Sequence, residues 1–401
     1  MNKMKMVGLA ALCMSGVFFM SCENKEKVLQ ENRYADEITV KMEEFVLPTN
    51  DELFLRDYNM ISSFTNESSL DIIAGYNYRI HALDLFSPQS NYVTQVKLDK
   101  EGRNGIHSPI DGLYVHSLDN IWIYSQGIVY LTDTTGTVKE KIDIGESHKE
   151  EFIYLFANYS VARINLHYNK KRKSLFYTTM IMQKNAKPQF QVYEYFLDSK
   201  HVKKHELSGS DYDTDIGTLY GWKQAPNVTF SDDRIIYNYP IESNIYTINL
   251  NDDSKQTFGA KSKYTKNIVH KMTKNTGYMD AERHKIENVH FFEIVYSPVL
   301  DLYFRLHVDR NDFSQDMDPF NQFYKKDMYL MIFNKKFEIV HEGKLPSNRY
   351  SIITSWCAVN NGLLMMVNNC FFNAGTDEDT IIFDIVEPSG KRIEKEKGLN
   401  Y

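Results

Sequence analysis

The sequence is short of positive charge and of local catalytic motifs. It has 46 Lys and Arg against 53 Asp and Glu. Loss of residues 1–21, which hold Lys3 and Lys5, would leave 46 − 2 = 44 basic residues against 53 acidic ones and a net charge of −9. This balance argues against a nucleic-acid partner. No G-x-S-x-G, H-E-x-x-H, Walker or G-x-G-x-x-G motif occurs, so no motif names a catalytic residue.

A long apolar run lies at the start of the chain. Lys3 and Lys5 precede an apolar stretch over residues 6–20, which has the length of a signal-peptide core and is too short for a comfortable membrane span. The run ends in Phe-Met-Ser-Cys at residues 19–22, which resembles the bacterial lipobox. We predict a lipoprotein signal peptide over residues 1–21 and lipidation of Cys22. An ordinary signal peptide with an incidental cysteine, or an uncleaved anchor, is the alternative.

The segment after Cys22 is polar. Residues 23–32 are highly charged and contain no aromatic side chain, as expected of a flexible tether, which we place over residues 22–34. Several acyl chains on one cysteine hold a protein stably on a membrane. The predicted membrane partner is therefore contacted through the N-terminal lipid and not through a basic patch.

Short strands and tight turns dominate the rest of the chain, in which Tyr and Phe are abundant at 27 and 24. Residues 112–144 predict four strands joined by tight turns at residues 119–120, 126–127 and 133–136. The same pattern recurs at a spacing of about 45 to 60 residues, which is the period of a β-propeller blade.

Six blades can be placed by this pattern, over residues 58–98, 112–144, 158–207, 227–258, 289–345 and 352 to the C-terminus. A strand at residues 37–46 is left over, and it would complete the last blade and close the ring, which protects sheet edges. We predict an all-β chain with one β-propeller domain over residues 35–401, whose blades are four-stranded antiparallel meanders. A seventh, degenerate blade and a β-sandwich with a second β domain remain open.

The lipobox, the charged tether and the repeated meanders together resemble the TolB-like six-bladed β-propeller lipoproteins of Gram-negative bacteria, many of which have no assigned function. The resemblance covers nearly the whole mature chain. It implies a lipid-anchored protein of the cell envelope, at the outer membrane. The sequence has no WD dipeptide, no Kelch double glycine and no clear sugar-dehydrogenase or peptidase signature. The resemblance therefore implies a fold and a location and transfers no catalytic residue.

Three long loops are expected on one face of the propeller. Loops that join strand two to strand three, and loops that join one blade to the next, emerge on the same face, and residues 209–224, 263–287 and 311–326 are the long ones. Binding sites concentrate on such loops. We predict that this loop-rich face binds a protein, a peptide or a glycan. The candidate ligand-face residues are Asp211, Asp213, Asp215, Tyr237, Tyr239, Asp316 and Asp318.

Some of these candidates have competing explanations. Residues 211–217 resemble the start of an EF-hand, which makes Ca²⁺ a candidate ligand, but Ile216 replaces the turn glycine and Trp222 the bidentate glutamate. Solvated loop carboxylates are the alternative. Tyr237 and Tyr239 could stack on sugar rings or pack within a blade.

The histidines and cysteines add little to the functional prediction. His201 and His205 flank a predicted strand with no Glu or Cys to complete a metal set, and we expect both at the surface. Cys357 and Cys370 could form a disulfide. If residues 360–362 are a hairpin turn, however, Cys357 faces Met365 or a near neighbour and Cys370 lies out of reach, which favours two buried free thiols.

Two functions follow from these predictions. The first is a non-catalytic binding or scaffold lipoprotein that acts through the loop-rich face. The alternative is a glycan-directed hydrolase or lyase with its site in the central funnel, because propeller enzymes assemble sites from single residues on several blades.

Overall fold

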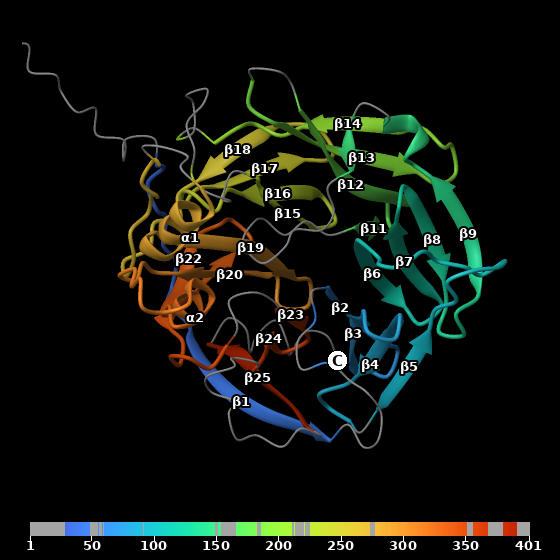
Figure 1. Cartoon of the computed structure of the whole chain (residues 1–401), viewed down its shortest axis with the longest axis horizontal. Helices are drawn as coiled ribbons and strands as arrows, with labels where there is room; N and C mark the ends of the chain where they lie inside the picture. Colours follow the sequence, from blue (N-terminus) through green and yellow to red (C-terminus); the bar gives the residue numbers. More distant parts are fainter. Residues whose placement is uncertain are drawn as a thin grey trace, which may run out of the picture.

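A computed structural model describes residues 29–390 except 49–54, 56, 57, 59, 91, 149, 150, 154–165, 183–185, 211, 213–219, 221–224, 273–276, 351–355 and 368–379. In this part of the chain six antiparallel sheets are arranged around a central channel, which confirms the six-bladed β-propeller (Figure 1). No helix in the described part is long and apolar enough to cross a bilayer.

The first three blades follow one another along the chain. Blade 1 contains β2 (Ile61–Thr65), β3 (Asp71–Asn77), β4 (Ala82–Phe86) and β5 (Val93–Lys97). Blade 2 contains β6 (Gly112–Ser117), β7 (Asn120–Ser125), β8 (Ile128–Thr132) and β9 (Val138–Asp143). Blade 3 contains β10 (Phe152–Ile153), β11 (His167–Asn169), β12 (Ser174–Ile181), β13 (Gln189–Phe196) and β14 (Val202–Glu206).

The other three blades complete the ring. Blade 4 contains β15 (Asn227–Phe230), β16 (Arg234–Asn238), β17 (Ile245–Asn249) and β18 (Lys255–Phe258). Blade 5 contains β19 (His290–Ser297), β20 (Leu302–Val308), β21 (Met328–Asn334) and β22 (Ile339–Lys344). Blade 6 contains β23 (Trp356–Val359), β24 (Gly362–Met366), β25 (Thr380–Ser389) and the N-terminal strand β1 (Thr39–Pro48).

The turn chemistry explains why the blades could be placed from sequence. In blade 2 the strands β7 and β8 are joined by Gln126 and Gly127, whose φ angles of 49° and 87° are both positive, as a two-residue type I′ hairpin requires. The backbone twist of this turn matches the right-handed twist of the strands that it joins. In blade 6, Cys357 on β23 lies opposite Leu364 on β24, which is the near neighbour of Met365 that the hairpin predicted. Cys370 lies outside the described residues.

The N-terminal strand closes the ring, as the leftover strand predicted. β1 pairs antiparallel with β25 from Thr39 opposite Ser389 to Pro48 opposite Thr380, and Figure 1 shows the blue strand along the outer edge of the red blade. The first and last blade-forming segments of the chain are thus held in one sheet, and blade 6 has all four of its strands.

Blade 3 departs from the regular meander. Its innermost strand comes in two pieces, because β10 and β11 both pair with β12, and residues 154–166 lie between them. The predicted start of this blade at residue 158 was therefore wrong, and the predicted turn at residues 169–173 was right. The second piece begins at His167, directly on the channel wall.

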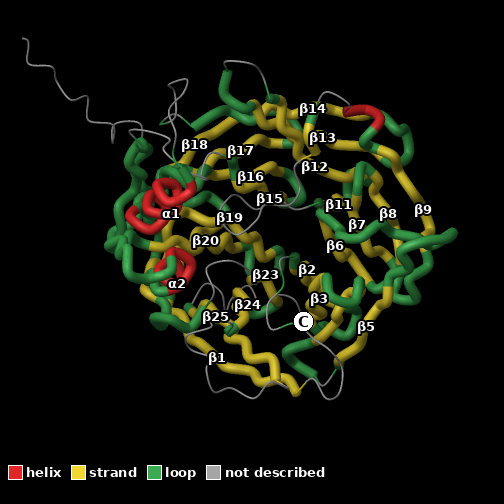
Figure 2. Tube along the Cα trace, in the orientation of Figure 1, coloured by secondary structure: helices red, strands yellow, loops and turns green. Residues whose placement is uncertain are grey.

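Two helices lie in the long loops around blade 5. α1 (Tyr278–Glu287) belongs to the connection from blade 4 to blade 5, and α2 (Pro319–Tyr324) lies between β20 and β21. Figure 2 shows the two helices next to each other. Lys326 Nζ donates to the carbonyl of Lys285 in the last turn of α1 at 3.0 Å, which ties the helices together.

Candidate functional site

The central channel contains a cavity of about 280 Å³ to which the innermost strand of every blade contributes. Its lining includes residues of the hairpins that join strand one to strand two, among them Asp232, Val299 and Asn360. These hairpins lie at the end of the channel opposite the loop-rich face. The cavity therefore belongs to the face with the short turns.

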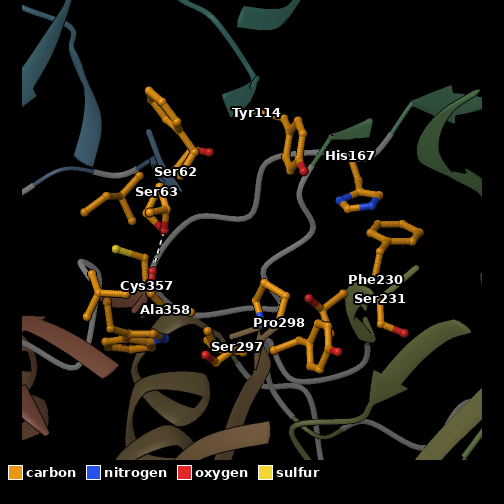
Figure 3. A pocket seen from close by; sticks show the side chains of 18 of the residues that line it. Ser62, Ser63, Tyr114, His167, Phe230, Ser231, Ser297, Pro298, Cys357 and Ala358 are labelled. Atoms are coloured by element: carbon orange, nitrogen blue, oxygen red, sulfur yellow. Dashed lines mark hydrogen bonds between the residues drawn. The ribbon is translucent and has the colours of Figure 1, made fainter. Parts of the chain in front are cut away.

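One wall of the cavity is aromatic. His167 on β11 stacks on Phe230 of β15, with ring centroids 5.0 Å apart and an angle of 13° between the planes. Tyr114 on β6 makes a T-shaped contact with the same imidazole, with the ring centroids 4.8 Å apart. Figure 3 shows the three side chains side by side along one wall. Neighbouring blades 2, 3 and 4 thus supply one residue each.

The polar atoms of this wall are available to a ligand. Neither the Tyr114 hydroxyl nor the His167 imidazole makes a hydrogen bond within the part of the chain that the structure describes. Burial lowers the pKa of His167 to about 3, with a smaller effect of His116 in the same direction. Burial also raises the pKa of Tyr114 to about 12. Near neutral pH the wall therefore presents a neutral imidazole and a protonated phenol.

The facing wall joins blades 1 and 6. Ser63 Oγ donates to the Ala358 carbonyl at 2.6 Å, the dashed line in Figure 3. The Asp71 carboxylate accepts from the Asn360 amide at 3.0 and 3.1 Å. Burial raises the pKa of Asp71, although its hydrogen bonds act in the opposite direction. These groups hold two blades together and are already occupied with protein partners.

The charge of the cavity has one sign. Its described lining residues include the carboxylates of Asp71, Asp232 and Glu293 and no lysine or arginine. An anionic ligand would lose hydration here without gaining a countercharge. The cavity is suited to a neutral or cationic group.

The structure places the predicted tyrosines inside the protein. Tyr237 on β16 and Tyr239 just beyond it are 2% and 5% exposed. The Tyr237 ring stacks on Tyr246 with centroids 5.2 Å apart. The Tyr239 hydroxyl donates to the Ser208 carbonyl at 2.7 Å. Both rings pack between blade 4 and the connection that precedes it, and Tyr239 also lines a cavity of about 560 Å³ beside the β12–β13 loop.

The predicted aspartates are not brought together. Asp211, Asp213 and Asp215 lie outside the described residues. Asp318 caps α2 by accepting from the Asn321 amide at 3.2 Å. Asp316 is exposed, and its backbone amide donates to Ser314 Oγ at 3.3 Å. Among the described residues no group of three His, Cys, Asp or Glu side chains is placed to hold a metal ion.

One histidine expected at the surface is buried. His205 is 3% exposed and lies 3.3 Å from Glu194 and 3.4 Å from Asp253. Glu194 also accepts from Arg172 and Ser174, so the carboxylate sits in a closed network within blade 3. The prediction failed because the strand spacing could not show that Asp253, in the β17–β18 turn of blade 4, lies against this side of β14. His201 is exposed, as predicted.

Sequence reasoning missed the channel residues. Tyr114, His167 and Phe230 each stand on the first strand of a blade, and that strand lines the channel in any propeller. Once blades are assigned, the polar and aromatic residues of first strands are the available signal. The contribution of blade 3 could not be recognised in this way, because its first strand is interrupted.

Comparison with known proteins gives a family and a fold. A family model described as a domain of unknown function, DUF4221, matches residues 29–344. The chain belongs to the DUF4221 family. No curated protein matches it significantly. The match spans blades 1 to 5 and the N-terminal strand of this DUF4221 chain.

Solved structures similar to the DUF4221 chain share its fold. A DUF4221 member from Bacteroides vulgatus is 16% identical with a TM-score of 0.70, over 88% of this chain and 99% of that one. A Bacteroides fragilis protein whose name describes it as exported is 11% identical with a TM-score of 0.52, over 89% and 98%. A TolB protein from Agrobacterium tumefaciens is 10% identical with a TM-score of 0.39, over 88% of this chain and 100% of that one.

Proposed function

We propose that this DUF4221 protein is an exported, lipid-anchored binding module that holds a neutral, ring-shaped group, such as one sugar residue, in its central channel. The observation that carries the proposal is the pair of polar groups on Tyr114 and His167, which have no hydrogen-bond partner among the described residues, beside the flat ring of Phe230. A cavity of about 280 Å³ is near the lower end of ligand pockets and suits one ring. Hydroxyl groups of a sugar can donate to the imidazole and accept from the phenol.

The channel is a better candidate than the loop-rich face. First strands of all six blades converge on it, whereas the described candidate residues of the loop-rich face are buried, exposed to solvent or used to cap a helix. A concave site with aromatic walls and a few oriented polar groups is a usual form of a small-ligand pocket.

Binding is favoured over catalysis by the ionisation of the channel residues. General acids and bases work best with pKa values near the operating pH. The imidazole of His167 and the phenol of Tyr114 both titrate far from it, at about 3 and about 12. The described lining also has no cation to stabilise the charge that develops in a hydrolase or lyase transition state.

A ligand screen tests this proposal. The full mature chain with Cys22→Ala is melted in the presence of neutral saccharides, uronic acids and short peptides, because a ligand of the native state raises the midpoint. Neutral saccharides are expected to raise it, and uronic acids are not. Stabilisation by uronic acids alone would overturn the assignment. Release of new reducing ends or unsaturated products by the wild-type protein would support the glycan-directed hydrolase or lyase instead.

The lipid anchor is supported by the lipobox ending at Cys22 and by the Bacteroides fragilis structural neighbour, which is described as exported. We propose a location in the cell envelope, at the outer membrane. In cells, Cys22→Ala should move the protein from the membrane fraction to the soluble fraction without changing its melting midpoint. Retention of the variant in the membrane fraction would contradict the anchor.

A further inference from the structure

The N-terminal segment before β1 is bound to the rim of the propeller. Leu29 is 5% exposed, and the Gln30 amide donates to Asn244 Oδ1 at 3.0 Å. The Asn32 side chain makes two hydrogen bonds with the backbone of Lys261, at 2.7 and 2.8 Å. The last residues of the predicted tether, 29–34, thus pack on blade 4 and the connection that leaves it.

The same segment continues onto blade 5. The Ala35 amide donates to the Ile339 carbonyl at 3.1 Å, and the Ile339 amide donates to the Arg33 carbonyl at 2.8 Å. At Gly259 the two backbones lie so close that a Cβ would be 2.3 Å from the Glu31 carbonyl oxygen. The chain therefore reaches the propeller at one fixed point, between the outer edges of blades 4 and 5.

This point is close to Cys22 along the chain. Six residues, 23–28, separate Cys22 from Leu29, and a fully extended chain of this length spans at most about 25 Å. If Cys22 is lipidated, which is part of the proposed function, the rim between blades 4 and 5 cannot move farther than this from the bilayer.

The surface at this point has the composition of a membrane interface. Tyr34 and Tyr264 are 68% and 46% exposed. The Tyr34 hydroxyl and the Lys261 carbonyl both accept from the Asn32 side chain, so Tyr34 and Lys261 are neighbours. The ammonium of Lys263 lies 5.1 Å from the centroid of the Tyr264 ring. We define the rim patch as Arg33, Tyr34, Lys261, Lys263, Tyr264 and Lys266.

The charge of the rim patch contrasts with that of the whole protein. Among the described residues, Glu31 is the carboxylate that pairs with one of its four cationic side chains, Lys261, at 2.7 Å, and Glu342 accepts from the Lys263 backbone amide at 3.1 Å. The whole chain carries a formal charge of −7. Tyrosines are enriched at the headgroup level of bilayers, and lysines near an anionic leaflet are attracted to it.

We propose that the rim patch rests on the phospholipid headgroup layer and fixes the orientation of the anchored propeller. The lipid supplies the attachment, and the patch selects which side of the propeller faces the bilayer. Lys261, Lys263 and Lys266 belong to the connection on the loop-rich face. The cavity lies at the opposite end of the channel, so in this orientation its mouth stays open to the aqueous phase.

Hydrogen exchange tests the orientation. The acylated full chain is placed in nanodiscs that contain anionic phospholipid, and amide exchange is compared with that of the soluble Cys22→Ala chain. The amides of residues 261–266 should exchange at least about threefold more slowly in the anchored form. The exchange rates of the hairpin at residues 169–173 should be the same in both forms. Equal rates at residues 261–266 in both forms would overturn the proposal.

A matched pair of variants separates the patch from the lipid. Replacement of Lys261, Lys263 and Lys266 by Gln should leave the protein on the nanodiscs and return exchange near residue 264 to the soluble rate. Replacement of the exposed Lys100, Lys170 and Lys171 by Gln should leave the protection in place. Protection that survives the patch variant would contradict the role of the lysines. Failure of the acylated wild type to associate with nanodiscs would overturn the anchor, and the orientation with it.

Discussion

The imidazole of His167 lies nearly parallel to the ring of Phe230, with the two centroids 5.0 Å apart. The residues belong to neighbouring blades and are separated by more than sixty positions in the sequence. The stack covers one face of the imidazole, and Figure 3 shows the His167 ring among the side chains that line the cavity. It makes His167 a rigid hydrogen-bonding group at the interface of blades 3 and 4.

Replacement of His167 by Phe should separate ligand binding from stability. The new ring keeps the stack on Phe230 but has no nitrogen to bind a ligand. Loss of one neutral hydrogen bond, about 0.5–1.5 kcal/mol, predicts roughly two- to twelvefold weaker binding of the saccharide found in the screen. Titration calorimetry measures this. The exposed His201→Phe is the control and should bind as the wild type does; an unchanged affinity in H167F would remove His167 from the site.

The same histidine predicts a dependence of stability on pH. Its folded pKa of about 3 lies below the unfolded value of 6.5. Between these values the unfolded chain binds a proton that the folded chain does not, so the free energy of unfolding falls as pH falls from about 6.5 to about 3. Urea titrations of wild type and H167F over this range should show a shallower dependence in the variant. Parallel curves would mean that the imidazole is protonated in the folded protein.

Glu194 should stabilise blade 3 only while it is ionised. Burial alone would raise its pKa, but hydrogen bonds from His205, Arg172 and Ser174 outweigh burial and lower the pKa to about 2. The folded pKa lies below the unfolded value of 4.5, so the stabilisation is present above pH 4.5 and is lost as pH falls toward 2. Glu194→Gln should cost roughly 3 kcal/mol at pH 7, because a shift of one pKa unit corresponds to about 1.4 kcal/mol.

Urea unfolding at pH 7 and at pH 3 checks this prediction. The difference between wild type and E194Q should be smaller at pH 3. Glu206→Gln, on the exposed side of β14 beside Lys204, is the control and should be nearly neutral at both pH values. A difference for E194Q that is independent of pH would indicate a packing defect instead of a lost charge.

Gly259→Ala should detach the N-terminal segment from the rim. The added Cβ would meet the Glu31 carbonyl oxygen at 2.3 Å, and backbone atoms must move to relieve the contact. Forced overpacking of this kind costs about 1–3 kcal/mol. Amides near Asn32 should exchange faster, and the melting midpoint should fall. Gly209→Ala is the control, since its Cβ would meet no atom within 4 Å; equal behaviour of the two variants would contradict the close docking.

Most blade boundaries were predictable from local chemistry, whereas the start of blade 3 was not. Hairpins such as Gln126-Gly127 need residues that accept positive φ, and such residues are visible in the sequence. The unpaired strand near residue 40 required a partner, and the incomplete last blade was the one available. Blade 4 was placed at residues 227–258, where the structure has it, because its strands alternate cleanly between short turns.

Burial and the channel site were decided by the tertiary structure. The sequence placed His205 at the surface and allowed Tyr237 to stack on a sugar ring, because it does not show which blade covers these residues. Tyr114, His167 and Phe230 come together only because three blades turn their first strands toward one axis. The sequence of this protein determined its strands, its turns and the lipobox-like stretch that ends at Cys22, since each depends on neighbours in the chain. Closure of the ring decided the cavity, because its walls come from residues that are far apart in sequence.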